Sequence, residues 1–281
     1  MMKTLKIARV GGHVVSGVGF VGVAVAALAT VALAGCVSSG GRDSNLKDSM
    51  SKDESAGHAN KQLGTVYLRQ GNLALAKEKL ERAERYTPRD PEVHMALAVL
   101  YERLDIPKEV DSHYRTAIRL APKDPAVLNN YAGYLCRTGR LEEGVERFLE
   151  AARNPLYRTP EMAYTNAGVC LRKANKLDEA AGSFQRALAI RANNAEATFQ
   201  AADLEFDRGD AAKARALVDK YLGTYDATAD LLLLAVRIAR AQGDRVAEDK
   251  FTRRLRVEFP NSQQLRSLSS ESAPTSNRTP G

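Results

Sequence analysis

The sequence contains no tryptophan and only three cysteines, at positions 36, 136 and 170. It also lacks common catalytic signatures: there is no Gly-x-Ser-x-Gly elbow, no phosphate-binding Gly-rich loop and no His-Glu-x-x-His zinc motif. The histidines after residue 35, at positions 58, 94 and 113, are not spaced as metal ligands. We therefore predict a protein that is not an enzyme and that has no cofactor, metal site or small-molecule substrate.

The chain also lacks a concentrated basic surface, although its formal net charge is +7. Lys3, Lys6 and Arg9 supply three of these charges, and residues 1–35 contain no acid. The remaining surplus is small and interleaved with acidic residues, whereas nucleic-acid binders usually concentrate basic residues on one face. We expect no nucleic-acid partner.

The first part of the chain has the pattern of an export signal. A short basic start is followed by the apolar, uncharged run Val14–Ala34. The run ends in Leu33-Ala34-Gly35-Cys36, which resembles the lipobox of bacterial lipoproteins. The resemblance implies that residues 1–35 are a signal peptide and that Cys36 is lipidated. It also favours the outer membrane, because residue 37 is Val and not the Asp that retains lipoproteins in the inner membrane of enteric bacteria. The alternative is an uncleaved helix anchored in the inner membrane.

Polar segments flank the rest of the chain. Residues 36–56 are rich in Ser and Gly and have no apolar period, so we predict a lipidated cysteine followed by a flexible tether. Residues 263–281 are rich in Ser, Thr and Pro, and we predict a disordered tail in which Leu265 and Leu268 could extend a short helix.

The segment between these ends is repetitive. With a 34-residue unit beginning at residue 57, the characteristic positions of a tetratricopeptide repeat are occupied by Leu63, Gly64, Tyr67, Gly71, Ala76, Leu80, Ala83 and Pro88. We expect an all-α tetratricopeptide-repeat superhelix of about six helix-turn-helix repeats over residues 57–262. The predicted repeats are 57–90, 91–124, 125–158, 161–194, 195–228 and 229–262, the register of the last being uncertain because Ala247 and Phe251 fall one place early.

The pattern has a direct physical reading. Small residues at repeat positions 8, 20 and 27 let helices approach closely, and large residues at 7, 11 and 24 fill the space between them. Gly at position 15 suits a turn with positive φ, and Pro at position 32 ends the second helix. Stacked repeats form an extended concave surface, which favours protein binding over catalysis.

A more specific resemblance lies at residues 129–170. The runs Asn129-Asn130-Tyr131-Ala132-Gly133-Tyr134-Leu135-Cys136, Asn154-Pro155-Leu156-Tyr157 and Asn166-Ala167-Gly168-Val169-Cys170 resemble the PilF/PilW family of type IV pilus lipoproteins, with Ala132 as a small departure. The resemblance implies a lipid-anchored protein on the periplasmic face of the outer membrane. It also implies that the protein binds the secretin, the ring-forming pore subunit, and promotes its localisation and multimerisation. An envelope scaffold that recruits cell-wall enzymes or another secretion complex is the alternative.

The resemblance also bears on Cys136 and Cys170. They fall on the first helices of neighbouring repeats, and family members carry the pair as a disulfide. An exported chain meets an oxidising compartment, which favours the bridge over two buried thiols.

Apolar residues at concave positions of the first two repeats suggest where a partner binds. We predict a groove formed by Lys61, Thr65, Leu68, Arg69, Met95 and Val99. Ordinary packing between first helices is the alternative. A clamp for a terminal carboxylate is disfavoured, because Thr65 and Ala96 stand where Asn would be needed.

Overall fold

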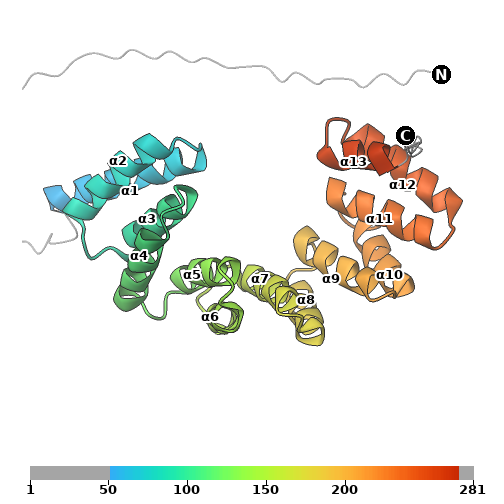
Figure 1. Ribbon diagram of the computed structural model, residues 1–281, viewed down its shortest axis with the longest axis horizontal. Coiled ribbons are helices and arrows are strands. Elements are labelled where there is room, and N and C mark those ends of the chain that lie inside the picture. Colours follow the sequence, from blue (N-terminus) through green and yellow to red (C-terminus); the bar gives the residue numbers. More distant parts are fainter. Residues whose placement is uncertain (1–50, 272–281) are drawn as a thin grey trace, which may run out of the picture. The chain divides into compact units, whose positions relative to one another are not determined.

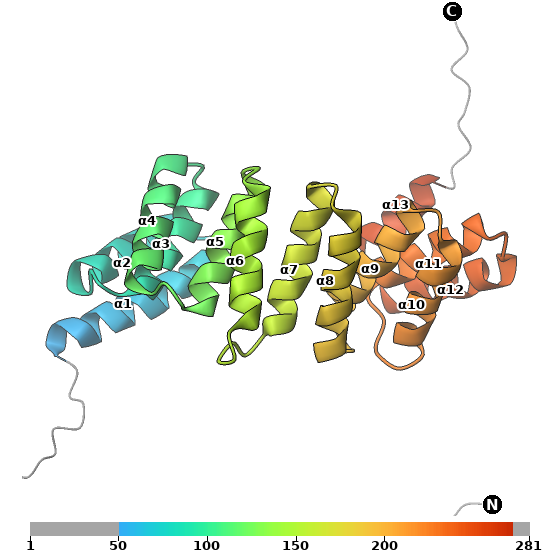
Figure 2. The same cartoon turned by 90° about the horizontal axis from the view of Figure 1, so that it is seen from below.

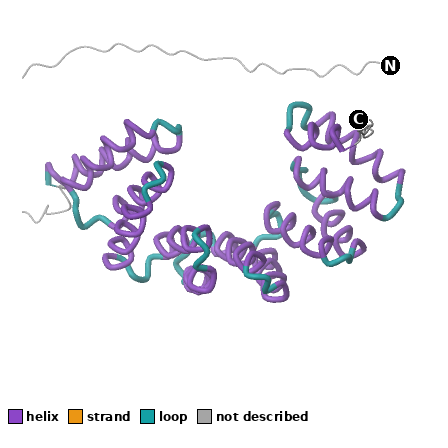
Figure 3. The backbone as a smooth tube through the Cα atoms, viewed as in Figure 1, coloured by secondary structure: helices purple, strands orange, loops and turns teal. Residues whose placement is uncertain are grey.

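The computed structural model describes residues 51–271. Every regular element in this part of the chain is an α-helix, and there are thirteen (Figures 1 and 3). The predicted all-α tetratricopeptide-repeat fold is therefore confirmed for the body. The predicted signal peptide, Cys36 and residues 272–281 lie outside the described residues.

Twelve of the helices form six consecutive antiparallel pairs. The pairs are α1 (Lys52–Arg69) with α2 (Leu73–Tyr86), α3 (Pro91–Arg103) with α4 (Pro107–Leu120), α5 (Pro125–Arg137) with α6 (Leu141–Arg153), α7 (Pro160–Lys173) with α8 (Leu177–Ile190), α9 (Ala195–Asp207) with α10 (Ala211–Leu222), and α11 (Ala229–Ala241) with α12 (Arg245–Glu258). A short helix, α13 (Gln263–Glu271), follows. Neighbouring pairs pack on one another along a curved row, as the two views show (Figures 1 and 2).

The turn inside each pair verifies the repeat register. Position 15 has positive φ in every repeat: four of these residues are the glycines Gly71, Gly139, Gly209 and Gly243, and the other two are Asp105 (φ 56°) and Asn175 (φ 57°). Gly, Asn and Asp are the residues that adopt this conformation at least cost. In the sixth repeat Gly243 and the bounds of α12 keep the positions seen in the other repeats, while the buried residues Ala247 and Phe251 lie one place early.

The core lies between the helices of each pair and between successive pairs. Ala76, Leu80 and Ala83 of α2 are fully buried, as is Phe184 of α8. Some contacts leave no room for a side chain. A Cβ placed on Gly168 would lie 2.4 Å from the Phe184 ring. Glycine at position 8 therefore sets how closely the two helices of a repeat approach.

Two predicted boundaries need correction. Helix α1 begins at Lys52, not at residue 57, so residues 52–56 belong to the helical body and not to the tether. A capping box fixes this start: the Glu54 amide donates to Ser51 Oγ (3.1 Å), and the Ser51 amide donates to the Glu54 carboxylate (2.8 Å). Residues 263–271 of the predicted tail form α13, the short helix that Leu265 and Leu268 indicated, and Leu268 is buried against α11.

The irregular end of the third repeat is a structured turn. The side chain of Asn154 accepts a hydrogen bond from the Leu156 amide (2.9 Å) and donates one to the Lys123 carbonyl (2.9 Å) of the preceding interhelical loop. Leu156 at the tip is 84% exposed. Between residues 51 and 271, none of the helices combines the length and apolar character needed to cross a bilayer.

Candidate partner-binding groove

The six residues predicted to bind a partner lie together. Lys61, Thr65, Leu68 and Arg69 come from α1, and Met95 and Val99 come from α3; all six line one groove with a volume of about 670 Å³. First helices of successive repeats lie side by side, so equivalent repeat positions converge on the same concave surface.

The groove has an apolar floor. Leu68 and Ala96 are buried, while Met95 and Val99 are half-buried, so their side chains face both the core and the open groove. Packing and exposure, which the sequence presented as alternatives, therefore both apply to these residues. An exposed apolar concavity of this kind is characteristic of a binding surface.

Other residues of the groove were not predicted from the sequence. Gln62, Val66, Ala96 and Asn130 also line it, together with His58 and Glu92. Val66 occupies repeat position 10, where Leu100 and Tyr134 are buried in the next two repeats, yet it is 36% exposed. The signal for Val66 was available: α1 is the first helix of the array, so this position is not covered by the second helix of an earlier repeat.

Lys61 at the rim is paired with two carboxylates of the protein. The Lys61 ammonium lies 2.7 Å from the Asp90 carboxylate and 2.6 Å from that of Glu92. Burial opposes the Lys61 charge, but hydrogen bonds and attraction from these two carboxylates outweigh it and raise the pKa of Lys61 above its ordinary value. Because Lys61 already has two anionic partners, it is poorly suited to capture a terminal carboxylate, in agreement with the sequence.

Contacts at the carboxyl ends of α1, α3 and α5 connect the first helices of successive repeats. The Arg103 guanidinium donates to the Leu68 carbonyl at the end of α1, where helix carbonyls lack helical partners. One repeat further on, the Arg137 guanidinium donates to the Glu102 carboxylate (Nη2–Oε2, 2.8 Å) and connects α3 to α5. These contacts leave the groove with a preformed shape.

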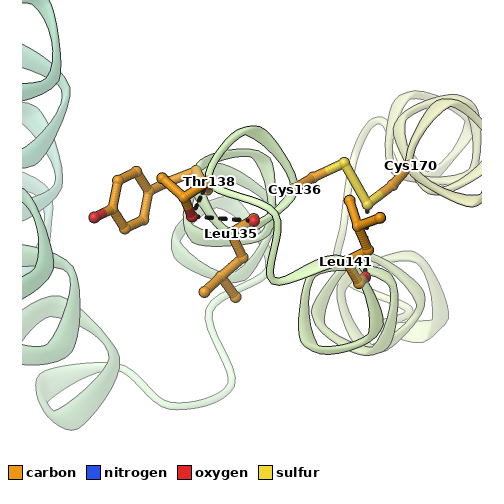
Figure 4. Close-up of a disulfide and its surroundings, with 6 residues drawn as sticks. Leu135, Cys136, Thr138, Leu141 and Cys170 are labelled. Atoms are coloured by element: carbon orange, nitrogen blue, oxygen red, sulfur yellow. Dashed lines mark hydrogen bonds between the residues drawn. A yellow bond between two sulfur atoms is a disulfide. The ribbon is translucent and has the colours of Figure 1, made fainter. Parts of the chain in front are cut away.

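The structure joins Cys136 and Cys170 in a disulfide between α5 and α7 (Figure 4). Their Cα atoms are 5.8 Å apart, within the range that a disulfide spans without backbone movement. Both cysteines are buried in a small apolar cluster with Ala132, Phe148 and Ala167. Figure 4 shows the bridge lying between helices of adjacent repeats.

Comparison with known proteins identifies the class of protein and then a relative of known name. The chain matches the Tetratricopeptide repeat family at residues 61–109, 137–196 and 166–231. It is 32% identical over 218 residues to the type IV pilus assembly protein PilF of Pseudomonas aeruginosa, a match that covers 78% of this chain and 86% of the relative.

Solved structures agree. The structure of P. aeruginosa PilF matches with a TM-score of 0.64 and 30% identity, over 78% of this chain and 99% of that one. PilW, described as a widely conserved type IV pilus biogenesis factor, matches with a TM-score of 0.66 and 27% identity, over 76% of this chain and 98% of that one.

The fold and its concave groove define a tetratricopeptide-repeat protein, a class whose members hold other proteins. Within that class, the chain belongs to the PilF/PilW family of type IV pilus biogenesis proteins.

Proposed function

We propose that this protein is an outer-membrane lipoprotein that binds the secretin of a type IV pilus system and promotes its localisation and multimerisation. The observation that carries the proposal is the groove between α1 and α3, where Val66, Met95 and Val99 keep apolar surface in contact with solvent. The relatives are named for pilus assembly and biogenesis, which supports a partner within that machinery.

The groove suits an apolar segment of the secretin. Its floor contributes hydrophobic contact, and burying such surface stabilises a complex by about 25 cal/mol per Å² before the costs of association. At its rim Lys61 is already paired with Asp90 and Glu92, so we assign specificity mainly to the shape and the apolar contacts of the floor. A preformed groove lowers the ordering cost of binding.

The anchor is the second part of the proposal. Acylation of Cys36 would attach the body to the periplasmic face of the outer membrane through the chain that runs into α1. More than one acyl chain gives stable attachment to a bilayer, whereas a single chain binds reversibly. A secretin subunit held by an anchored protein is at high effective concentration near its site of insertion, which favours multimerisation.

The groove can be tested with charge substitutions. The double variant Val66→Glu/Met95→Glu is preferable to changes at Leu68, which is only 5% exposed and whose replacement by Glu would threaten folding. A matched control is Val246→Glu on α12, where the side chain is 82% exposed outside the groove. We expect secretin co-purification and secretin multimers to fall at least about tenfold in the groove variant, because its carboxylates would lose water on binding.

The control should leave both readouts unchanged, and circular dichroism should show all variants folded. Normal secretin capture by the folded groove variant would contradict the assignment of this surface. If a deletion strain has normal pili and normal secretin multimers, the functional proposal itself is wrong.

The anchor is tested separately with Cys36→Ala. The substitution should abolish incorporation of labelled palmitate and globomycin-sensitive processing, and the protein should leave the outer-membrane fraction. Unlabelled wild-type protein, or labelled protein confined to the inner membrane, would count against this part of the proposal.

A further inference from the structure

Three potential metal ligands meet where the first two repeats join. Glu84 lies on α2, His94 on α3 and His113 on α4, and one ligand atom from each lies within 4.8 Å of the other two. The two Nδ1 atoms of the histidines are 3.1 Å apart. The Glu84 carboxylate oxygen lies 3.6 Å from His94 Nδ1 and 4.0 Å from His113 Nδ1.

The hydrogen bonding of His94 decides which of its nitrogens is available. Its Nε2 lies 2.9 Å from the Pro88 carbonyl oxygen, which can only accept a hydrogen bond. Nε2 therefore carries the proton, and Nδ1 presents its lone pair to His113 and Glu84. A histidine that donates to a backbone carbonyl through one nitrogen and ligates through the other is the usual arrangement at metal sites.

The spacing of the three atoms suits a small tetrahedral ion. Ligands that sit about 2.0–2.1 Å from zinc at tetrahedral angles are roughly 3.3–3.4 Å from one another. The separations of 3.1, 3.6 and 4.0 Å bracket that value. Two imidazoles and one carboxylate form a donor set that zinc accepts, with the fourth position left for water.

The surroundings hold the cluster in place and leave it one side open. The side chains of His94 and His113 are 7% and 12% exposed, while that of Glu84 is 35% exposed and leaves a path for entry. The ring of Tyr101 stacks on His113 at 5.4 Å and limits its rotation.

We propose that Glu84, His94 and His113 bind a divalent transition-metal ion, zinc by preference, which links α2 to α3 and α4. The site does not depend on the secretin assignment. A bound ion would stiffen α3, one of the two helices that form the groove, because His94 directly precedes the groove residue Met95.

The test uses the full chain, purified in detergent without a histidine tag and stripped with chelator. Titration with Co²⁺ should give the visible absorption of tetrahedral cobalt at one equivalent per chain, and Zn²⁺ should displace it. His94→Gln and His113→Gln should each weaken binding at least about tenfold, since even residues behind the ligands contribute 10–100-fold at metal sites. The matched control is His58→Gln, which removes an exposed histidine outside the cluster.

Glu84→Gln is the ligand variant expected to stay folded, because the side chain is partly exposed and the substitution changes its shape little. It should weaken binding while circular dichroism stays that of the wild type. If the wild type binds no Co²⁺, or if the variants at positions 84, 94 and 113 bind it as tightly as the wild type, the proposal is overturned. The latter result would place any bound metal elsewhere in the chain.

Discussion

Removing the bridge between Cys136 and Cys170 should loosen the middle of the array. The two cysteines are separated by 34 positions. For a loop of this length, loop-closure entropy lost from the unfolded chain corresponds to about 4 kcal/mol of stability at room temperature. The double variant Cys136→Ala/Cys170→Ala removes the bridge without burying a hydroxyl, and Ala suits a cluster that already contains Ala132 and Ala167.

The loss of stability should affect the repeats joined by the bridge more than the rest of the array. Repeat proteins unfold as coupled neighbouring units, so a single unfolding midpoint would average over repeats that the bridge does not touch. Native-state hydrogen exchange is therefore the appropriate assay. We expect protection of α5–α8 to fall by up to about 4 kcal/mol, with smaller changes in α1 and α12.

Reduction of the wild type offers an internal comparison. Reductant should reproduce the effect of the double substitution, and it should not alter the double variant. Mass spectrometry must first establish that the untreated protein lacks free thiols at these two positions. If oxidised and fully reduced wild type show the same protection in α5–α8, the reasoning from chain entropy fails.

Two further predictions concern the core. Gly168→Ala should destabilise the fourth repeat by about 1–3 kcal/mol, because the added Cβ would collide with the Phe184 ring. Gly182→Ala in α8 should stabilise the same repeat by about 0.5–1 kcal/mol, because its Cβ would meet nothing within 4 Å. Urea unfolding measures both changes. Burial and the nearby Asp226 raise the pKa of Tyr221 above 10, so its contribution is complete below pH 10 and is lost as pH rises through the folded value. Tyr221→Phe should therefore make stability less sensitive to alkaline pH.

The repeat phase was predictable because it repeats a physical requirement. Each turn between the two helices of a repeat needs a residue that accepts positive φ. Four of the six turns have glycine there, at Gly71, Gly139, Gly209 and Gly243, and these glycines are visible in the sequence. The start of α1 was not predicted, because Ser51 and Glu54 lie in a polar stretch. A capping box there is not followed at once by the periodic apolar residues that usually identify a helix start. The short helix indicated by Leu265 and Leu268 is α13, and only its extent to Glu271 was not predicted, because the residues after Leu268 are polar.

Part of the groove was predictable, because the position of a residue within the repeat fixes whether its side chain faces the concave surface. Met95 and Val99 could be placed on the concave surface from their positions alone, and both line the groove. Val66 could have been added from the place of α1 as the first described helix of the array, where no earlier described repeat covers it. The cluster of Glu84, His94 and His113 could not be read from local spacing, because its residues come from three helices and meet only after the repeats stack.

The two ends of the helical array differ in a way that gives it direction. Leu268 of α13 packs against α11 of the last repeat, while Val246 and Val257 of α12 stay 82% and 75% exposed. At the opposite end, Leu63 of α1 remains 47% exposed beside Val66. An incoming amphipathic helix could therefore extend the stack of described helices at α1, where no earlier described repeat covers Leu63 and Val66.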